Sequence, residues 1–153
     1  MFIRYHDKKI DQKYAPQGDI ALNLFNEMEQ ARCEAIGGII YPGAAKNIEN
    51  NVEKKSKKFF ENSEPNKKFP LQDSLTLLIK KKASNLKLSE NSEKGLKMWE
   101  DFILNESKSN LTKIIGSIAN QEEFAKLSRN IIKDLGYGDQ LGDDPNKEDN
   151  AEN

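Results

Sequence analysis

The sequence predicts an all-α protein, folded as a compact bundle of five to six helices. Along most of the 153 residues, apolar side chains recur at the three- and four-residue intervals of an amphipathic helix. No segment alternates apolar and polar residues over the length of a strand, and isoleucine and valine do not cluster between turn residues as hairpins require. Because hydrophobic residues make up 36% of the chain and charged residues 32%, the expected core is lean.

The first half of the chain contains two predicted helices. Residues 1–16 are expected to be irregular, and the clearest helix covers residues 18–36, after which Gly37-Gly38 is expected to stop it. A second helix is predicted from about residue 43 to residue 60, and the polar loop at 62–70 follows it. The inward-facing residues are Ile20, Ala21, Leu24, Met28, Ala31 and Ala35 in the first helix, and Ile48, Val52, Phe59 and Phe60 in the second.

The second half contains three or four shorter helices, each placed by its apolar stripe and by a polar residue that can cap it. A third helix is predicted to begin near Leu71 and a fourth after Ser89, and Ser109 can cap a short fifth. Asn120 is expected to cap a sixth, which Gly136 would end because glycine favours the left-handed conformation at a helix C-terminus.

The charge of the chain is unevenly distributed, although its formal net charge is −1. Residues 139–153 contain six acidic residues and one lysine, a composition typical of a disordered segment. We therefore expect three parts: an irregular segment at 1–16, a helical domain at 17–137, and an acidic tail or linker start at 138–153.

Several classes of protein are excluded by what the sequence lacks. It contains no apolar run long enough for a membrane span and no secretory signal at its start, so a cytoplasmic location is expected. There is no G-x-x-x-x-G-K-[ST] or G-x-G-x-x-G motif for nucleotides. Its single cysteine cannot form an internal disulfide or a zinc site.

The single histidine, the single cysteine and the lysine clusters are interpreted as structural features rather than as functional sites. We expect His6 to be exposed and Cys33 to lie on the outer half of its helix without a base to activate it. No catalytic, cofactor-binding or metal-binding residue is assigned. The lysine clusters at 54–58, 67–68 and 80–82 are read as solvated faces, because the overall charge is balanced and no aromatic residues alternate with them.

The helix at 18–36 carries more polar residues on and beside its apolar face than packing explains. One polar stripe is formed by Asn23, Glu27, Gln30 and Glu34, whereas Arg32 falls inside the apolar face, three residues from Glu29. An arginine there either forms an intramolecular pair with Glu29 or reaches a partner protein. The candidate partner interface consists of Glu27, Gln30, Arg32 and Glu34.

Parts of this helix and of both ends of the chain resemble the CobT subunit of aerobic cobaltochelatase. The N-terminal motifs are Ala15-Pro16-Gln17-Gly18, Phe25, Glu29-Gln30-Ala31-Arg32-x-Glu34-Ala35-Ile36-Gly37 and Gly43-x-Ala45-x-Asn47. Near the C-terminus, Gly138-Asp139-x-x-Gly142-Asp143-Asp144-Pro145 resembles the point where that family enters a long acidic linker. The resemblance spans nearly the whole chain and is thinner in the middle, where Trp99 and Phe124-Ala125 match.

The resemblance implies a role in ATP-driven insertion of cobalt into hydrogenobyrinic acid a,c-diamide during aerobic cobalamin biosynthesis. In that family a large subunit binds the corrin, an AAA+ ATPase subunit hydrolyses ATP, and the CobT subunit assembles with the ATPase. The family's von Willebrand A-like domain carries a metal-binding D-x-S-x-S motif, which does not occur in these 153 residues. ATP, Mg and Co are thus implied for the holoenzyme, and none for this segment.

The expected function is therefore that of a non-catalytic assembly or docking domain. It would belong to a subunit of cobaltochelatase, which is a ligase that forms metal–nitrogen bonds. Its expected partners are the AAA+ ATPase subunit and the large corrin-binding subunit. The alternatives are a lysine-rich helical module that binds nucleic acid, a general protein-interaction module, and a stand-alone enzyme, for which no set of residues is found.

Overall fold

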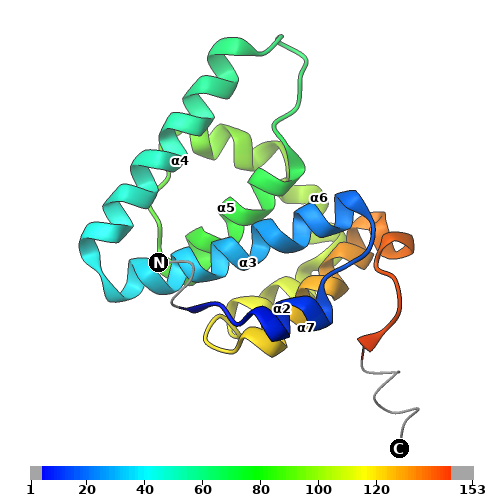
Figure 1. Ribbon diagram of the computed structural model, residues 1–153. Coiled ribbons are helices and arrows are strands. Elements are labelled where there is room, and N and C mark those ends of the chain that lie inside the picture. The colour runs from blue at the N-terminus through cyan, green and yellow to red at the C-terminus, as the bar shows by residue number, and fades with distance from the viewer. Residues whose placement is uncertain (1–4, 146–153) are drawn as a thin grey trace, which may run out of the picture.

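The computed structural model describes residues 5–145, and within that range it contains helices and no strand, which confirms the all-α prediction. Figure 1 shows the helices in order along the chain. They are α2 (Lys8–Tyr14), α3 (Asp19–Ile40), α4 (Pro42–Asn62), α5 (Leu71–Ser84), α6 (Glu90–Ile115) and α7 (Gln121–Ile132), followed by the π turn η1 (Lys133–Tyr137) and the 3-10 turn η2 (Gly138–Gln140).

Helix α3 is the centre of the fold, since it packs against α4, α5, α7 and η2. Helix α5 lies between α3 and α6, and α6 continues the packing to α7. The core is built mainly from aliphatic residues of α3, α5, α6 and α7, with Tyr14, Phe25 and Phe124 as its buried aromatic members. Helix α4 lies at one side of the molecule and α2 with α7 at another (Figure 1).

Helix α2 corrects the prediction that residues 1–16 are irregular. The Asp7 side chain caps it by accepting hydrogen bonds from the backbone amides of Lys9 (2.8 Å) and Ile10 (3.4 Å). Its Tyr14 is fully buried, and the Tyr14 carbonyl accepts a hydrogen bond from Arg129 (2.9 Å). A helix of seven residues is too short to display an apolar period, so tertiary contacts define it.

The predicted stop at Gly37-Gly38 is also wrong, because α3 continues to Ile40. Gly38 faces α4, where an added Cβ would lie 3.7 Å from the Cα of Ala45, an ordinary van der Waals distance, so the space there does not require a glycine. Tyr41 separates the two helices, and Pro42 occupies the first position of α4, where a proline needs no amide hydrogen.

The predicted fourth and fifth helices follow each other without a loop in α6, where a kink with non-helical backbone at Ser107 (φ −142°) separates two helical segments. Ser107 Oγ and Asn110 Nδ2 both donate hydrogen bonds to Asp134 Oδ2, at 2.7 and 2.6 Å. The break therefore coincides with a polar anchor to η1. The expected cap of α7 is present, since Asn120 Oδ1 accepts from the Glu123 amide at 3.1 Å, and Gly136 adopts the left-handed conformation (φ +105°).

Residues 138–142, which the sequence assigned to the acidic tail, pack against the start of α3. The N-cap of α3 is Gly18, which has no side chain to accept a hydrogen bond. Gln140 fills this role from the other end of the chain: its Oε1 accepts from the Ala21 amide (3.0 Å), and its carbonyl accepts from the Gly18 amide (2.9 Å). The rest of the predicted tail, residues 146–153, lies outside the described residues.

Candidate functional site

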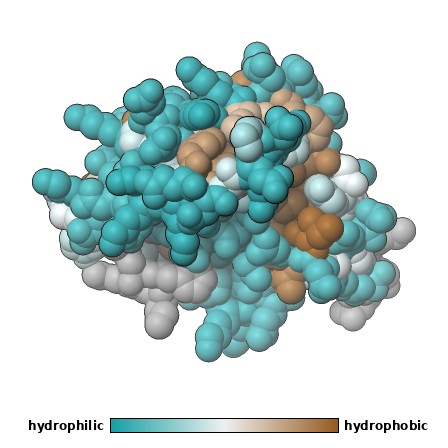
Figure 2. Space-filling view, turned by 90° about the horizontal axis from the view of Figure 1, so that it is seen from above, coloured by the Kyte–Doolittle hydropathy of each residue, from teal (hydrophilic) through white to brown (hydrophobic). Residues whose placement is uncertain are grey.

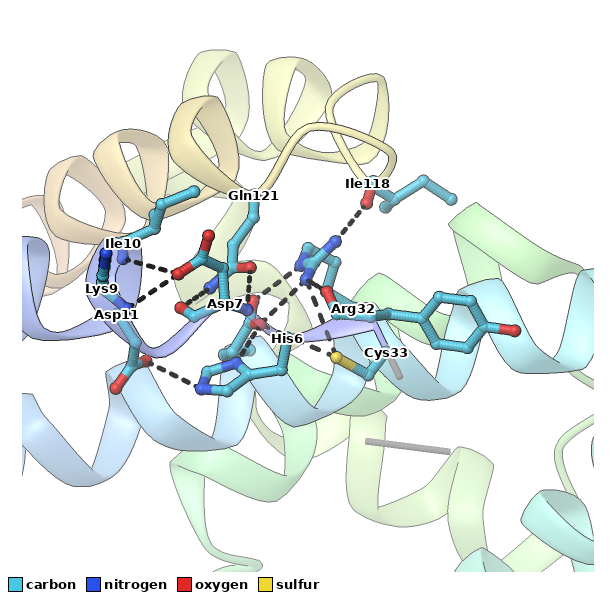
Figure 3. A network of polar contacts seen from close by, with 11 residues as sticks. His6, Asp7, Lys9, Ile10, Asp11, Arg32, Cys33, Ile118 and Gln121 are labelled. Atoms are coloured by element: carbon cyan, nitrogen blue, oxygen red, sulfur yellow. Dashed lines mark hydrogen bonds and ion pairs between the residues drawn. The ribbon is translucent and has the colours of Figure 1, made fainter. Parts of the chain in front are cut away.

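A buried ion pair lies at the middle of α3 (Figure 3). Arg32 donates from Nε to Glu29 Oε1 (2.7 Å) and from Nη2 to Glu29 Oε2 (2.9 Å), and the two residues are 2% and 5% exposed. Arg32 also donates to the carbonyls of Ile118 (3.0 Å) and Tyr5 (2.6 Å). Burial alone would lower the pKa of Arg32, but the hydrogen bonds and the charge of Glu29 outweigh this and raise it.

His6 and Cys33 belong to the same network, which corrects both predictions about them. The His6 side chain is only 10% exposed, and its Nδ1 lies 2.7 Å from Glu29 Oε2. Cys33 is 1% exposed, and its thiol lies 3.7 Å from the same carboxylate oxygen. Burial raises the pKa of the Cys33 thiol to about 12, with the negative charge of Glu29 adding to the effect. The thiol is therefore protonated and shielded at neutral pH.

This network explains the arginine inside the apolar face of α3. It joins three parts of the chain: the segment before α2, helix α3, and the connection between α6 and α7, which contributes the Ile118 carbonyl. The intramolecular alternative for Arg32 is thus confirmed. Because its guanidinium is buried and fully engaged, Arg32 does not belong to an exposed surface, and the candidate interface retains Glu27, Gln30 and Glu34.

These three residues line one open groove between α3, α4 and α5, with a volume of about 590 Å³. Its apolar lining comes chiefly from α4 and α5 and from the loop between them. The apolar lining residues are Ala44, Ile48, Val52, Phe69 and Leu77, together with Cys33 of α3. Helical geometry explains the division of the motif, because Glu29 and Arg32 face the core while Glu27, Gln30 and Glu34 face the groove.

Two ion pairs cross the walls of the groove. Lys80 of α5 lies 3.1 Å from Glu34 of α3, and Lys55 of α4 lies 2.8 Å from Asp73 of α5. Burial alone would lower the pKa of Lys55, but its hydrogen bond to Asp73 and the charges of Asp73, Glu27 and Glu34 raise it. Sequence reasoning missed these lysines because Lys55 and Lys80 stand in clusters that read as solvated faces.

Two lysines lie over aromatic rings: Lys68, which belongs to the cluster at 67–68, and Lys94, which lies outside the lysine clusters. Lys68 Nζ lies 4.8 Å from the centre of the Trp99 ring, and Lys94 Nζ lies 4.7 Å from that of Phe60. The aromatic residues come from other segments, so no alternation of aromatic and basic residues along the chain could have revealed them. These rings already have a cation as partner.

Within residues 5–145, no group of three or more His, Cys, Asp and Glu side chains is arranged to hold a metal ion. In the same part of the chain, no helix has the length and apolar character needed to cross a membrane. Seen from above, the surface is mostly hydrophilic, with hydrophobic residues gathered in one region (Figure 2).

The fold and the groove define a class: a small all-α domain whose central helix holds the core on one face and lines an open, mixed-polarity groove on another. The comparison with known families then identifies the chain itself. The family model described as "Cobalamin biosynthesis protein CobT" matches residues 1–153, so the chain belongs to the CobT family of cobalamin biosynthesis. No solved structure matches the chain.

Proposed function

We propose that this domain is a non-catalytic docking module of a cobaltochelatase subunit, which acts in the cytoplasm. It would support the ATP-driven insertion of cobalt, the metal substrate, into hydrogenobyrinic acid a,c-diamide. In this proposal ATP and magnesium are bound by the AAA+ ATPase subunit, and the corrin by the large subunit. Membership of the CobT family supports the pathway, and the groove supports the docking role.

The observation that carries the proposal is the placement of three polar residues in one open groove. None of these residues, Glu27, Gln30 and Glu34, is buried in the core. All three line the groove between α3, α4 and α5. The buried pair of Arg32 and Glu29 holds the same helix in place from its other side. A rigid helix that presents polar groups beside an apolar floor is suited to binding another protein.

The test is co-purification of residues 1–153 with the cognate AAA+ ATPase and, separately, with the large subunit. Light scattering would measure the mass of each complex with and without ATP. The whole chain is used because Gln140 caps α3. We expect a stable complex with the ATPase; a folded protein that binds neither subunit would contradict the docking role.

A matched pair of variants tests whether the groove is the docking surface. Asn50 and Asn51 are neighbouring exposed residues of α4, but only Asn51 lines the groove. Asn51→Arg should abolish or strongly weaken the complex by filling the groove, whereas Asn50→Arg should leave it intact. Equal effects of the two substitutions would place the docking surface elsewhere.

The second candidate is binding of single-stranded nucleic acid, which the pairing of Lys68 with Trp99 and of Lys94 with Phe60 favours. It predicts that an oligonucleotide quenches Trp99 fluorescence and that affinity falls steeply with salt. Unchanged Trp99 fluorescence during this titration at low salt would exclude binding of single-stranded nucleic acid.

A further inference from the structure

We propose that the groove between α3, α4 and α5 binds a short basic and apolar segment of its partner protein. An arginine of that segment would meet Glu27, while one or two adjacent aliphatic side chains would enter the apolar part of the groove. This inference rests on the proposed docking function and adds the chemistry of the partner to it.

The groove is open because the apolar side of α4 is incompletely covered. Helix α4 packs against α3 and α6, and only Ile48 and Ser56 of its 21 residues are buried. Its second half is held to α6 by Ser56, whose Oγ lies 2.9 Å from Ser92 Oγ. Between these contacts Val52 remains partly exposed and lines the groove. A helix with an incompletely covered apolar side offers a surface that a partner can bury.

The volume of the groove limits how much of a partner can enter it. A helix about 10–12 Å wide, with a rise of about 1.5 Å per residue, occupies roughly 150 Å³ per residue. A groove of about 590 Å³ therefore holds the equivalent of about four residues by this measure. Because the groove is open, a bound segment needs to place only its anchor side chains in this volume, and the rest of the segment can lie outside it.

The charged residues that line the groove favour a cationic group in its occupant. The groove is lined by three carboxylates, Glu27, Glu34 and Asp73, and by two lysines, Lys55 and Lys80. Glu34 and Asp73 are each paired with one of these lysines. Among residues 5–145, Glu27 has no ion-pair partner within 4.0 Å. The three carboxylates and two lysines leave the groove with a net charge of −1, which favours a cationic side chain, and an arginine can bind the Glu27 carboxylate with two parallel hydrogen bonds.

The experiment is a titration of isotope-labelled residues 1–153 with two capped peptides, followed by NMR. One peptide carries a single arginine between leucines, and the other has glutamine in place of the arginine. We expect the arginine peptide to shift the amide signals of α3, α4 and α5 around the groove, and to bind about tenfold more tightly than the glutamine peptide. The Glu27→Gln variant should remove this preference, whereas Glu106→Gln, on an exposed part of α6, should retain it.

Equal binding of both peptides, signals that shift away from the groove, absence of binding, or a preference that survives Glu27→Gln would each overturn the inference. These outcomes are separate from those of the docking test. If the ATPase complex forms and Asn51→Arg breaks it, the docking role stands even when the peptide chemistry fails. If the peptide binds as expected and no cobaltochelatase subunit does, the groove chemistry stands and the assignment to that complex fails.

Discussion

Replacing Arg32 with alanine should destabilise the domain by about 3 kcal/mol. The guanidinium donates four hydrogen bonds of 3.0 Å or less, to both oxygens of Glu29 and to the carbonyls of Tyr5 and Ile118. Its loss leaves a buried carboxylate without its main partner, and breaking such a pair costs about 3–5 kcal/mol. His6 remains 2.7 Å from Glu29 and offsets part of this loss, which places the expectation at the lower end.

The assay is urea unfolding followed by far-ultraviolet circular dichroism, with a thermal scan beside it. In a domain of this length, a loss of about 3 kcal/mol corresponds to a fall in Tm of roughly 6–12 °C. Gln30→Ala is the matched control, because Gln30 is exposed on the same helix, and it should change stability by less than about 0.5 kcal/mol. If Arg32→Ala unfolds at the same urea concentration as Gln30→Ala, the network contributes nothing to stability and the reasoning is refuted.

Removing the Glu29 carboxylate as well separates the ion pair from the other hydrogen bonds of Arg32. The double variant Glu29→Ala/Arg32→Ala leaves no uncompensated carboxylate in the core. Its loss of stability should therefore be smaller than the sum of the two single losses, with a coupling energy of about 1–3 kcal/mol. Additive losses would show that the two side chains act independently.

The remaining predictions concern other parts of the fold. Because the Cys33 side chain is 1% exposed and burial raises the pKa of its thiol, labelling by a thiol reagent at pH 8 should require opening of the fold; immediate labelling of the folded protein would contradict this. The thiol of the unfolded chain ionises first, so stability should fall as pH rises from about 9 toward 12, and Cys33→Ala should flatten that pH dependence. Gln140→Ala should cost about 1 kcal/mol in urea unfolding by removing the cap of α3, whereas the exposed neighbour substitution Asp139→Ala should cost much less; equal losses would exclude a capping role. Gly95→Ala should destabilise by about 1–3 kcal/mol, since its Cβ would lie 2.9 Å from a buried aromatic ring, while Gly43→Ala, with open space around it, should be neutral or slightly stabilising; calorimetry that shows no difference between them would refute the packing argument.

The helix boundaries show where local patterns are informative and where they fail. Asn120 caps α7 as predicted, because capping depends on residues three positions apart. Gly37-Gly38 did not end α3, because glycines are tolerated inside a helix when tertiary packing supports it. Helix α2 escaped prediction since its one fully buried side chain, that of Tyr14, donates its hydrogen bond to Glu122 of α7, more than a hundred residues later.

The candidate site was predicted only in part. The sequence grouped Glu27, Gln30, Arg32 and Glu34 as one polar set on one helix. The structure divides this set, because Arg32 is covered by the segment before α2 and by the connection between α6 and α7. Nothing in the spacing of the motif indicates which of its two sides those segments cover.

By itself, the sequence determined that this protein is helical, where most of its helices begin, and that the central helix carries more charge than packing requires. Helical period and capping are local properties, so they can be read from neighbouring residues. Only the tertiary structure decided that Glu29 is buried while Glu27, two residues earlier, faces an open groove. Burial depends on which distant segments pack against each face: His6, 23 residues earlier, and the Ile118 carbonyl, 86 residues beyond Arg32, enclose one side, whereas α4 leaves the other side open.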